Sequence, residues 1–286
     1  MKHLKRVAAT ALLLAAACLP AGAQELLVGS YNIRYRNSAD SVKGNGWERR
    51  CPVVCDLINF MRPDVFGAQE VLKAQLDDME VALPEYAHIG VGRDDGRTAG
   101  EYEAIFFRPA AVKLLEEGHF WLSETPEKPG RGWDAACTRI CTWGKFRSRH
   151  SRRTFYFFNL HLDHVGVVAR RESARLVLER IREIAKGAPV ILTGDFNVDQ
   201  RDEIYTRFVG SGLLKDSYEH ARYRFAENGT FNSFRPESHT DGRIDHVFVS
   251  PAMDVLRYGV LTGGYWTPDG LRLPSDHYPV FTALSW

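Results

Sequence analysis

The chain has 286 residues, of which 44% are hydrophobic, 12% aromatic and 26% charged. This composition supports a large buried core and excludes a disordered protein, a collagen-like repeat and a small disulfide scaffold. The 37 lysine and arginine residues nearly balance the 36 aspartate and glutamate residues. This balance argues against a protein that coats nucleic acid or anionic lipid through charge alone, although it leaves room for a local basic patch.

The amino-terminal segment has the pattern of a secretory signal peptide. Residues 1–6 are positively charged, residues 7–19 form an apolar run rich in alanine and leucine, and residues 21–23 fit a small-residue cleavage site. The apolar run is too short for a membrane-spanning helix. We therefore predict a signal peptide over residues 1–23, with cleavage before Gln24. Cleavage would leave 34 basic and 36 acidic residues, a net charge of −2.

Export is the expected localisation, either to the periplasm or as a secreted protein. Cys18 follows three alanines, a poor match to a lipobox, so a lipid-anchored form is the less favoured outcome. No later segment is long and apolar enough to be a transmembrane segment.

After the predicted signal peptide, the sequence predicts mainly strands, with a few helices between them. In the first half, apolar runs predict a strand over 26–33, a helix over 47–61, a strand over 64–69, a helix over 72–82, and strands over 86–91, 102–108, 112–121 and 138–147. In the second half we predict a strand over 153–161, a helix over 167–186, a strand over 189–193, a helical stretch near 202–210, a polar connection over 216–240, and strands over 244–250, 255–262 and 278–284. Since there is no internal repeat and no linker, one α+β domain is expected.

Four cysteines follow the signal peptide, in two pairs with i,i+4 spacing: Cys51 with Cys55, and Cys137 with Cys141. An exported protein can form disulfides, whereas these spacings fit the common zinc motifs poorly. Cys55 and Cys141 lie in apolar patterns that favour structural roles. The disulfide connectivity stays open.

Polar residues stand where several apolar runs stop. These residues are Asn32, Glu70, His161, Asp195, Asn197, Asp245, Asp276 and His277. Any single one could be a turn residue or a satisfied structural group. Carboxylates avoid protein cores unless they are paired or bind a metal, so this many at strand ends indicates convergence on one site. A donor set rich in oxygen suits Mg²⁺ or Mn²⁺ better than zinc.

Seven segments, in chain order, resemble the endonuclease/exonuclease/phosphatase superfamily: SYNIRY, GAQE, GEYEAIFFRP, NLHLDH, TGDFN, RIDHVFVS and SDHYPV. The resemblance runs from about residue 25 to residue 285, and GDFN followed by SDH is its most specific part. It implies a deoxyribonuclease-like fold, which is a four-layer α+β sandwich of two mainly antiparallel β-sheets flanked by helices. It also implies a single catalytic domain over residues 24–286.

The resemblance implies a metal site and a group that activates water. Glu70 matches the family's Mg²⁺-binding glutamate, and Asn32 matches the asparagine that helps to orient the metal and the phosphate. We place Asp276, the acid of the closing Asp-His pair, at the metal as well. Asp195 matches the aspartate that activates the attacking water, and Asn197 matches the asparagine that holds the phosphate.

Two histidines complete the implied site. His277 matches the histidine that contacts the scissile phosphate, and Asp245 matches the carboxylate that orients it. His161 occupies the place of the second histidine of the deoxyribonuclease branch. Glu101 resembles the glutamate that partners this second histidine, and Glu103 is the alternative, because strand register decides which side chain points inward.

The chemistry of phosphoester hydrolysis agrees with these roles. The transition state gathers negative charge on the phosphoryl oxygens, which a metal ion and hydrogen-bond donors can stabilise. We expect His161, His277 and Asn197 to donate to these oxygens. No serine, cysteine or lysine nucleophile is required, so water should attack directly. Arg139 is a supporting residue that could bind a substrate oxygen or serve in a structural ion pair.

The sequence favours an exported Mg²⁺-dependent phosphodiester hydrolase, with Mn²⁺ as the alternative cofactor and nucleic acid as the favoured substrate. The net charge of −2 gives no broad basic surface, and the best local basic patch consists of Arg147, Arg149, Arg152 and Arg153. The alternatives are a sphingomyelinase-like phospholipid hydrolase, a sugar or inositol phosphate hydrolase, and a catalytically silent binding protein on the same fold. A phosphate-ester substrate is the expected partner, and nothing in the sequence calls for an obligate protein partner.

Overall fold

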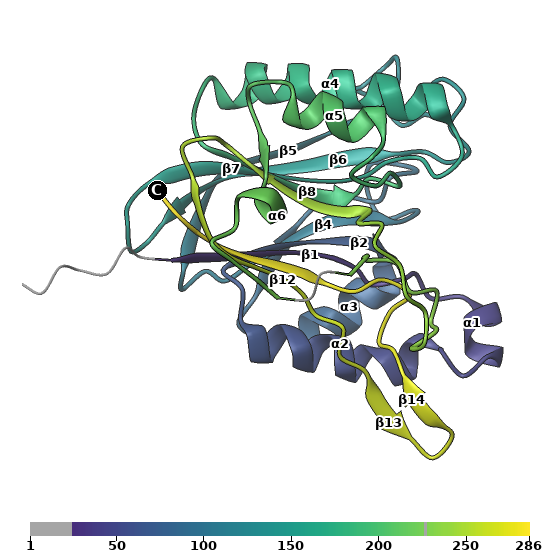
Figure 1. Cartoon of the computed structure of the whole chain (residues 1–286). Helices are drawn as coiled ribbons and strands as arrows, with labels where there is room; N and C mark the ends of the chain where they lie inside the picture. Colours follow the sequence, from purple (N-terminus) through teal and green to yellow (C-terminus); the bar gives the residue numbers. More distant parts are fainter. Residues whose placement is uncertain (1–24, 226–227) are drawn as a thin grey trace, which may run out of the picture.

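Two β-sheets packed face to face form the centre of the molecule, and helices cover the outer face of each sheet (Figure 1). The structure is a computed structural model that describes residues 25–225 and 228–286. The predicted signal peptide and Cys18 lie outside the described residues. The arrangement of helix, sheet, sheet and helix confirms the predicted four-layer α+β sandwich.

The first sheet has the strand order β10-β12-β15-β1-β2-β4-β3. Its strands are β1 (Leu26–Asn32), β2 (Val65–Val71), β3 (Ala87–Ile89), β4 (Tyr102–Phe107), β10 (Tyr223–Phe225), β12 (Asp254–Val260) and β15 (Val280–Ser285). β1 runs parallel to β2 and β10 parallel to β12, whereas the other neighbours are antiparallel.

The second sheet has the strand order β5-β6-β7-β8-β11-β9. Its strands are β5 (Val112–Trp121), β6 (Ile140–Ser148), β7 (Thr154–His161), β8 (Val190–Asp195), β9 (Lys215–Asp216) and β11 (Asp245–Val249). Only β7 and β8 are parallel neighbours in this sheet. Both sheets are therefore mixed but mainly antiparallel, as predicted. A separate hairpin of β13 (Tyr265–Thr267) and β14 (Gly270–Arg272) projects from the sandwich (Figure 1).

The helices are divided between the two outer faces. α2 (Trp47–Met61) and α3 (Lys73–Ala82) cover the first sheet, and α4 (Val167–Ala185) and α5 (Glu203–Val209) cover the second (Figure 1). α1 (Ser38–Val42) and α6 (Ser217–His220) are short. No described helix has both the length and the apolar character needed to cross a membrane.

Apolar side chains fill three layers, which explains why the central strands were recognisable in the sequence. Val28, Phe157 and Ile191 are fully buried between the two sheets. Val177 of α4 packs in the layer behind the second sheet, and Ile58 of α2 packs in the layer behind the first. Strands covered on both faces have nearly continuous apolar sequences.

A polar cluster crosses the interior and ties the two sheets together. Asn159 on β7 donates from Nδ2 to the Ala68 and Ala104 carbonyls, both at 3.0 Å. Its Oδ1 accepts from Gln69 Nε2 at 2.7 Å and from Thr193 Oγ1 at 3.1 Å. Every hydrogen-bonding atom of this buried amide is therefore satisfied across the sandwich, which fixes β2 and β4 relative to β7 and β8.

The predicted elements differ from the structure chiefly where elements are very short. The polar connection over 216–240 contains β10 and α6, which are three and four residues long. α1 and the β13–β14 hairpin were not expected either. Elements this short do not complete the periodic pattern on which sequence prediction depends.

The cysteine thiols are free in the described chain. Cys55 and Cys141 are buried, which fits the structural roles expected of them. The Sγ atoms of Cys51 and Cys55 lie 4.0 Å apart on one face of α2. Cys137 lies beside the cavity described below.

Candidate active site

Strand ends from both sheets meet at one edge of the sandwich. In the first sheet, the parallel strands β1 and β2 carry Asn32 and Glu70 at this edge. In the second sheet, His161 at the end of β7 lies opposite Asp195 at the end of β8, and Asp195 lies opposite Asp245 of β11. Strand register therefore gathers residues that are far apart in the sequence.

Asp195 lies at the centre of this group. Its Oδ2 accepts a hydrogen bond from Asn32 Nδ2 at 3.1 Å, and lies 3.4 Å from His161 Nε2 and 3.6 Å from His277 Nε2. Its Oδ1 accepts from the backbone nitrogen of Asn197 at 2.9 Å. Burial raises the pKa of Asp195 to about 7, although the neighbouring His277 acts in the opposite direction. This carboxylate can therefore accept a proton near neutral pH.

His277 and Asp245 form a buried pair. His277 Nδ1 donates to Asp245 Oδ2 at 2.8 Å. Burial disfavours the charged imidazolium, but the carboxylates of Asp245 and Asp195 outweigh this effect and hold the pKa of His277 well above its ordinary value. The ring of Phe231 packs edge-on against the imidazole of His277, with 5.0 Å between the ring centroids. His277 is thus held as a cation with Nε2 directed toward Asp195.

Two further carboxylates lie beside this pair. Glu70 accepts from Asn32 Nδ2 at 3.0 Å and from the backbone nitrogen of Tyr35 at 3.1 Å. Arg34 Nη1 lies 3.4 Å from Asp276 Oδ2 and 4.0 Å from Glu70 Oε2. Burial raises the pKa of Asp276, and Glu70 adds to this effect. These acids repel one another, and one guanidinium lies close to both.

The backbone is strained where it carries Arg34, Glu70 and Asn197. Their φ angles are 60°, 61° and 50°, in the left-handed region. This conformation costs a residue with a side chain roughly 1–2 kcal/mol. In Glu70 it accompanies a β-bulge between Ala68 and Val71, and bulges commonly redirect a side chain next to an active site. Strained backbone of this kind often clusters at functional sites, which agrees with the site expected at this edge.

His161 is held as a neutral imidazole. Asn197 Nδ2 donates to the Leu162 carbonyl at 2.9 Å and to His161 Nε2 at 3.0 Å. Because Nε2 accepts, the ring carries its proton on Nδ1. Burial, with Arg139 and Arg93 nearby, holds the pKa of His161 well below its ordinary value. Asn197 therefore sets the orientation and the tautomer of this ring.

Two glutamates lie close to His161. One carboxylate oxygen of each of Glu101 and Glu103 and one ring nitrogen of His161 lie within 4.8 Å of one another. Glu101 forms a two-pronged ion pair with Arg93, at 2.6 and 3.1 Å. Glu103 is fully buried with no partner for either oxygen among the described residues, and burial raises its pKa to about 8. The pairing of His161 with Glu101 stays a prediction. Glu103 stays the alternative partner of His161, and its carboxylate oxygens accept no hydrogen bond from the described residues.

A cavity of about 380 Å³ opens over these residues. The predicted residues that line it are Glu70, Glu101, Arg139, His161, Asp195, Asn197, Asp276 and His277. Asn32 and Asp245 are fully buried behind the lining and support it. All ten predicted site residues therefore lie in or directly behind one cavity, although their individual roles stay predictions.

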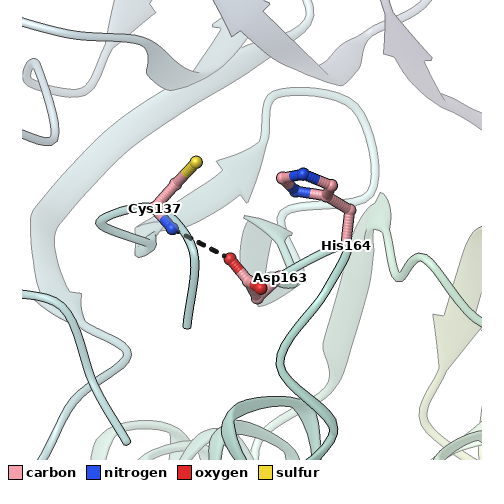
Figure 2. Close-up of side chains that lie close together, drawn as sticks. All are labelled: Cys137, Asp163 and His164. Atoms are coloured by element: carbon pink, nitrogen blue, oxygen red, sulfur yellow. Dashed lines mark hydrogen bonds between the residues drawn. The ribbon is translucent and has the colours of Figure 1, made fainter. Parts of the chain in front are cut away.

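Cys137, Asp163 and His164 form another cluster with metal-ligating side chains at the edge of this cavity (Figure 2). Asp163 already accepts from the backbone nitrogens of residues 136, 137, 165 and 166, at 2.7–3.2 Å. Although burial opposes ionisation, these bonds hold the pKa of Asp163 well below its usual range. The Sγ atom of Cys137, one carboxylate oxygen of Asp163 and one ring nitrogen of His164 lie within 4.8 Å of one another. Asp163 therefore holds the two loops in place through four backbone hydrogen bonds.

The Endonuclease/Exonuclease/phosphatase family matches residues 29–277. The chain belongs to this family. The match covers the residues of the site described above and confirms the resemblance seen in the sequence. Family members hydrolyse phosphoester bonds, so the chain is a phosphoesterase-family protein.

Two solved structures from Bacteroides thetaiotaomicron superimpose on the chain with a TM-score of 0.90. One is an endonuclease/exonuclease/phosphatase family protein, 51% identical, with 92% of this chain and 98% of that chain covered. The other is a mannosyl-6-phosphatase, 52% identical, with 91% of this chain and 100% of that chain covered. These bacterial family members share both the fold and half of the sequence.

The curated relatives are more distant. An uncharacterised mimivirus protein is 31% identical over 163 residues, and nocturnin of Drosophila melanogaster is 23% identical over 271 residues. The alignments cover 54% and 81% of this chain, but only 60% and 41% of those proteins. The chain thus spans less than two thirds of the length of these relatives.

The donor set of this family member fits a hard divalent cation. Glu70 and Asp276 supply carboxylate oxygens to the cavity, and Asn32 supports Glu70 from behind. Magnesium and manganese prefer oxygen ligands of this kind. Glu70 and Asp276 would therefore hold the ion.

Two arginines of the site were not expected from the sequence. Arg34 lies two residues after Asn32 within SYNIRY, and this proximity was the available signal. Arg93 lies in a loop before β4, and its local sequence gave no signal. Its place in the site depends on the ion pair with Glu101, which only the folded chain reveals.

Proposed function

We propose that the chain is a divalent-metal-dependent hydrolase that releases phosphate from a small sugar phosphate by direct attack of water. The observation that carries this proposal is the convergence of Asp195, the His277–Asp245 pair and Glu70 on one cavity of about 380 Å³. The 52% identity to a mannosyl-6-phosphatase supports the sugar-phosphate substrate. Mg²⁺ is the expected ion and Mn²⁺ its alternative.

The reaction follows from the protonation states of the site. Ionised Asp195 takes a proton from the attacking water, since its pKa of about 7 matches this task. Protonated His277, held by Asp245, donates from Nε2 to a phosphoryl oxygen as negative charge develops there. As the bond from the water oxygen to phosphorus forms, the bond from phosphorus to the sugar oxygen breaks, and the departing sugar oxygen takes up a proton from solvent. Asn197 keeps His161 oriented beside the same carboxylate. When bound at Glu70 and Asp276, the metal would supply Lewis-acid stabilisation of the phosphoryl charge.

Nucleic acid, which the sequence favoured, becomes the second candidate substrate. Phe231 at the cavity is 40% exposed and could stack on a base. Against this, the proposed basic patch of Arg147, Arg149, Arg152 and Arg153 lies at the β6–β7 hairpin, whereas His161 ends β7. An eight-residue strand spans roughly 23 Å, so this patch lies far from the cavity. It cannot guide a backbone across the site from that position.

A metal and substrate panel tests the proposal. The chain lacking residues 1–23 is treated with EDTA, reconstituted with Mg²⁺ or Mn²⁺, and assayed on hexose phosphates, inositol phosphates, sphingomyelin, and single- and double-stranded DNA and RNA. We expect activity on hexose phosphates that EDTA abolishes and either ion restores. Full activity in EDTA would exclude the metal role, and turnover of nucleic acid alone would select the second candidate. Metal binding without hydrolysis of any substrate would favour a silent binding protein.

We further propose that the protein is exported. The charged, apolar and small-residue regions of residues 1–23 support this. Expression of the full chain in a bacterial host, followed by cell fractionation and intact-mass measurement, should give an extracytoplasmic product that begins at Gln24. A cytoplasmic product that retains residue 1 would contradict export.

A further inference from the structure

One wall of the cavity consists of two ion pairs whose charges are already balanced. Arg93 and Glu101 are joined at 2.6 and 3.1 Å. Arg139 Nε lies 3.4 Å from Asp163 Oδ2, and Arg139 Nη2 lies 3.1 Å from His164 Nδ1. Each guanidinium thus has its own carboxylate. Although this wall contains two arginines, it offers little net positive charge.

This charge balance decides what the wall can bind. A second phosphate group accepts hydrogen bonds but donates none, so it would be repelled by Glu101 and would find no uncompensated cation. A hydroxyl group both donates and accepts. Glu101 retains accepting capacity beyond its bonds to Arg93, and Arg139 retains Nη1 as a donor. Donors and acceptors therefore stand side by side, which suits a molecule with several hydroxyl groups.

Burial adds to the strength of these contacts. The side chains of Arg93 and Glu101 are 10% and 15% exposed, and Arg139 is 4% exposed. Each pair is thus already largely shielded from water before a ligand arrives. The cavity, at about 380 Å³, is at the small end of ligand-binding pockets, which suits one sugar better than a polymer.

We propose that the Arg93–Glu101 pair, with Arg139 and His164, forms the binding site for a neutral, polyhydroxylated leaving group. This inference rests on the proposed phosphoester hydrolysis and adds which residues select the substrate. The metal and catalytic residues would hold the phosphate, and the wall would hydrogen-bond to the sugar hydroxyls. The wall then distinguishes a hexose phosphate from esters with apolar or charged leaving groups.

The test compares three substrates in the metal-loaded enzyme: a hexose 6-phosphate, p-nitrophenyl phosphate, which lacks hydroxyls, and a hexose 1,6-bisphosphate. The variants are Glu101→Gln, which keeps the shape beside Arg93, and Arg139→Lys, which keeps the charge beside Asp163. Glu85→Gln is the matched control, because Glu85 pairs with Arg62 on the exposed surface. The readout is kcat/KM for the hexose 6-phosphate divided by kcat/KM for p-nitrophenyl phosphate.

We expect this ratio to fall about 10-fold or more in Glu101→Gln and Arg139→Lys, mainly through KM, because hydrogen bonds to charged groups contribute about 1.5–3 kcal/mol. Glu85→Gln should keep the wild-type ratio, and the wild type should prefer the monophosphate to the bisphosphate. Unchanged ratios in both variants, or a preference for the bisphosphate, would overturn the inference while the proposed function stands. A wild type that hydrolyses p-nitrophenyl phosphate but no hexose phosphate would refute the sugar-phosphate function itself. If Glu101→Gln does not fold, Arg139→Lys and the wild-type bisphosphate comparison still decide the inference.

Discussion

The environments of Asp195 and His277 raise the pKa values of both side chains. Burial raises the pKa of the Asp195 carboxyl to about 7, and carboxylates around His277 raise the pKa of its imidazole. A base that must be ionised loses activity as pH falls, and an acid that must be protonated loses activity as pH rises. The rate should therefore pass through a maximum between these two pKa values. Asp245 sets the alkaline side of this window because it contacts His277 directly.

Replacement of this carboxylate should narrow the pH window. In Asp245→Asn the charge that supports the His277 imidazolium is lost, so the pKa of His277 falls and the alkaline limb of kcat/KM moves to lower pH. We also expect kcat to fall about 10²-fold, since the ring loses its orientation. The full pH profile of both proteins measures this, with Asp254→Asn as the control, because Asp254 is exposed at the start of β12. An alkaline limb that stays in place would remove Asp245 from this role.

Glu103 gives a second prediction at the residue scale, on stability. Its pKa is about 8 in the folded chain, against an ordinary value of 4.5. The folded state therefore holds a proton that the unfolded state releases, and stability from this group is complete below about pH 4.5 and declines until about pH 8. The decline is about 1.4 kcal/mol per pH unit. Glutamine cannot ionise, so Glu103→Gln should gain stability relative to the wild type across this window.

Urea unfolding of Glu103→Gln and the wild type at pH 5, 6.5 and 8 measures the difference between their free energies of unfolding. Glu117→Gln on β5 serves as a control, because Glu117 is exposed. The control should run parallel to the wild type at all three values. A constant difference between Glu103→Gln and the wild type would show that Glu103 is already ionised in the folded protein.

At the scale of elements, the site depends on how the two sheets are held together. The first sheet supplies Asn32 and Glu70, and the second supplies His161, Asp195 and Asp245. The Asn159 cluster links these halves a few residues behind the site. A shift between the sheets would therefore separate Glu70, the proposed metal ligand, from Asp195, the proposed general base.

Gly67 on β2 lies where the first sheet packs directly against Asn159 and Thr193 of the second sheet, with no room for a side chain. A Cβ atom there would overlap the side-chain amide of Asn159 and the hydroxyl of Thr193. We expect Gly67→Ala to destabilise the fold by about 1–3 kcal/mol through overpacking. We also expect kcat to fall about 10-fold or more, because Glu70 and Asp195 are displaced relative to each other. Gly130→Ala meets no atom within 4 Å and serves as the control in thermal unfolding and kinetics. Equal activity in both variants would contradict this coupling.

The same scale shows how far the sequence could predict the molecule. Continuous apolar runs predicted the strands that are buried on both faces, and the polar residues at the ends of these runs predicted a shared site. The choice between Glu101 and Glu103 could not be made, since both side chains lie near His161 and only the ion pair with Arg93 separates them. Arg93 was missed because its partner depends on a loop conformation. The short β9 and α6 lack a periodic pattern.

At the scale of the whole molecule, the charge distribution favours uptake of a cation. Residues 24–286 carry a net charge of −2, and four carboxylates gather at one edge: Glu70, Asp195, Asp245 and Asp276. They are all buried, and their mutual repulsion opposes folding. Arg34 and His277 compensate only part of this charge. A divalent ion bound there should therefore stabilise the whole fold and not the site alone.

Thermal unfolding of the EDTA-treated protein with and without 10 mM MgCl₂ or MnCl₂ measures this linkage. At an ion concentration about 100 times the dissociation constant, binding to the folded state adds about 2.7 kcal/mol, which should raise Tm by roughly 5–8 °C in a chain of this size. Glu70→Gln should lose most of the rise because it removes one ligand charge. NaCl at equal ionic strength controls for screening, and Glu85→Gln controls for the loss of a surface carboxylate. A rise of the same size in Glu70→Gln, or with NaCl alone, would place the ion elsewhere and break the connection between charge, metal and activity.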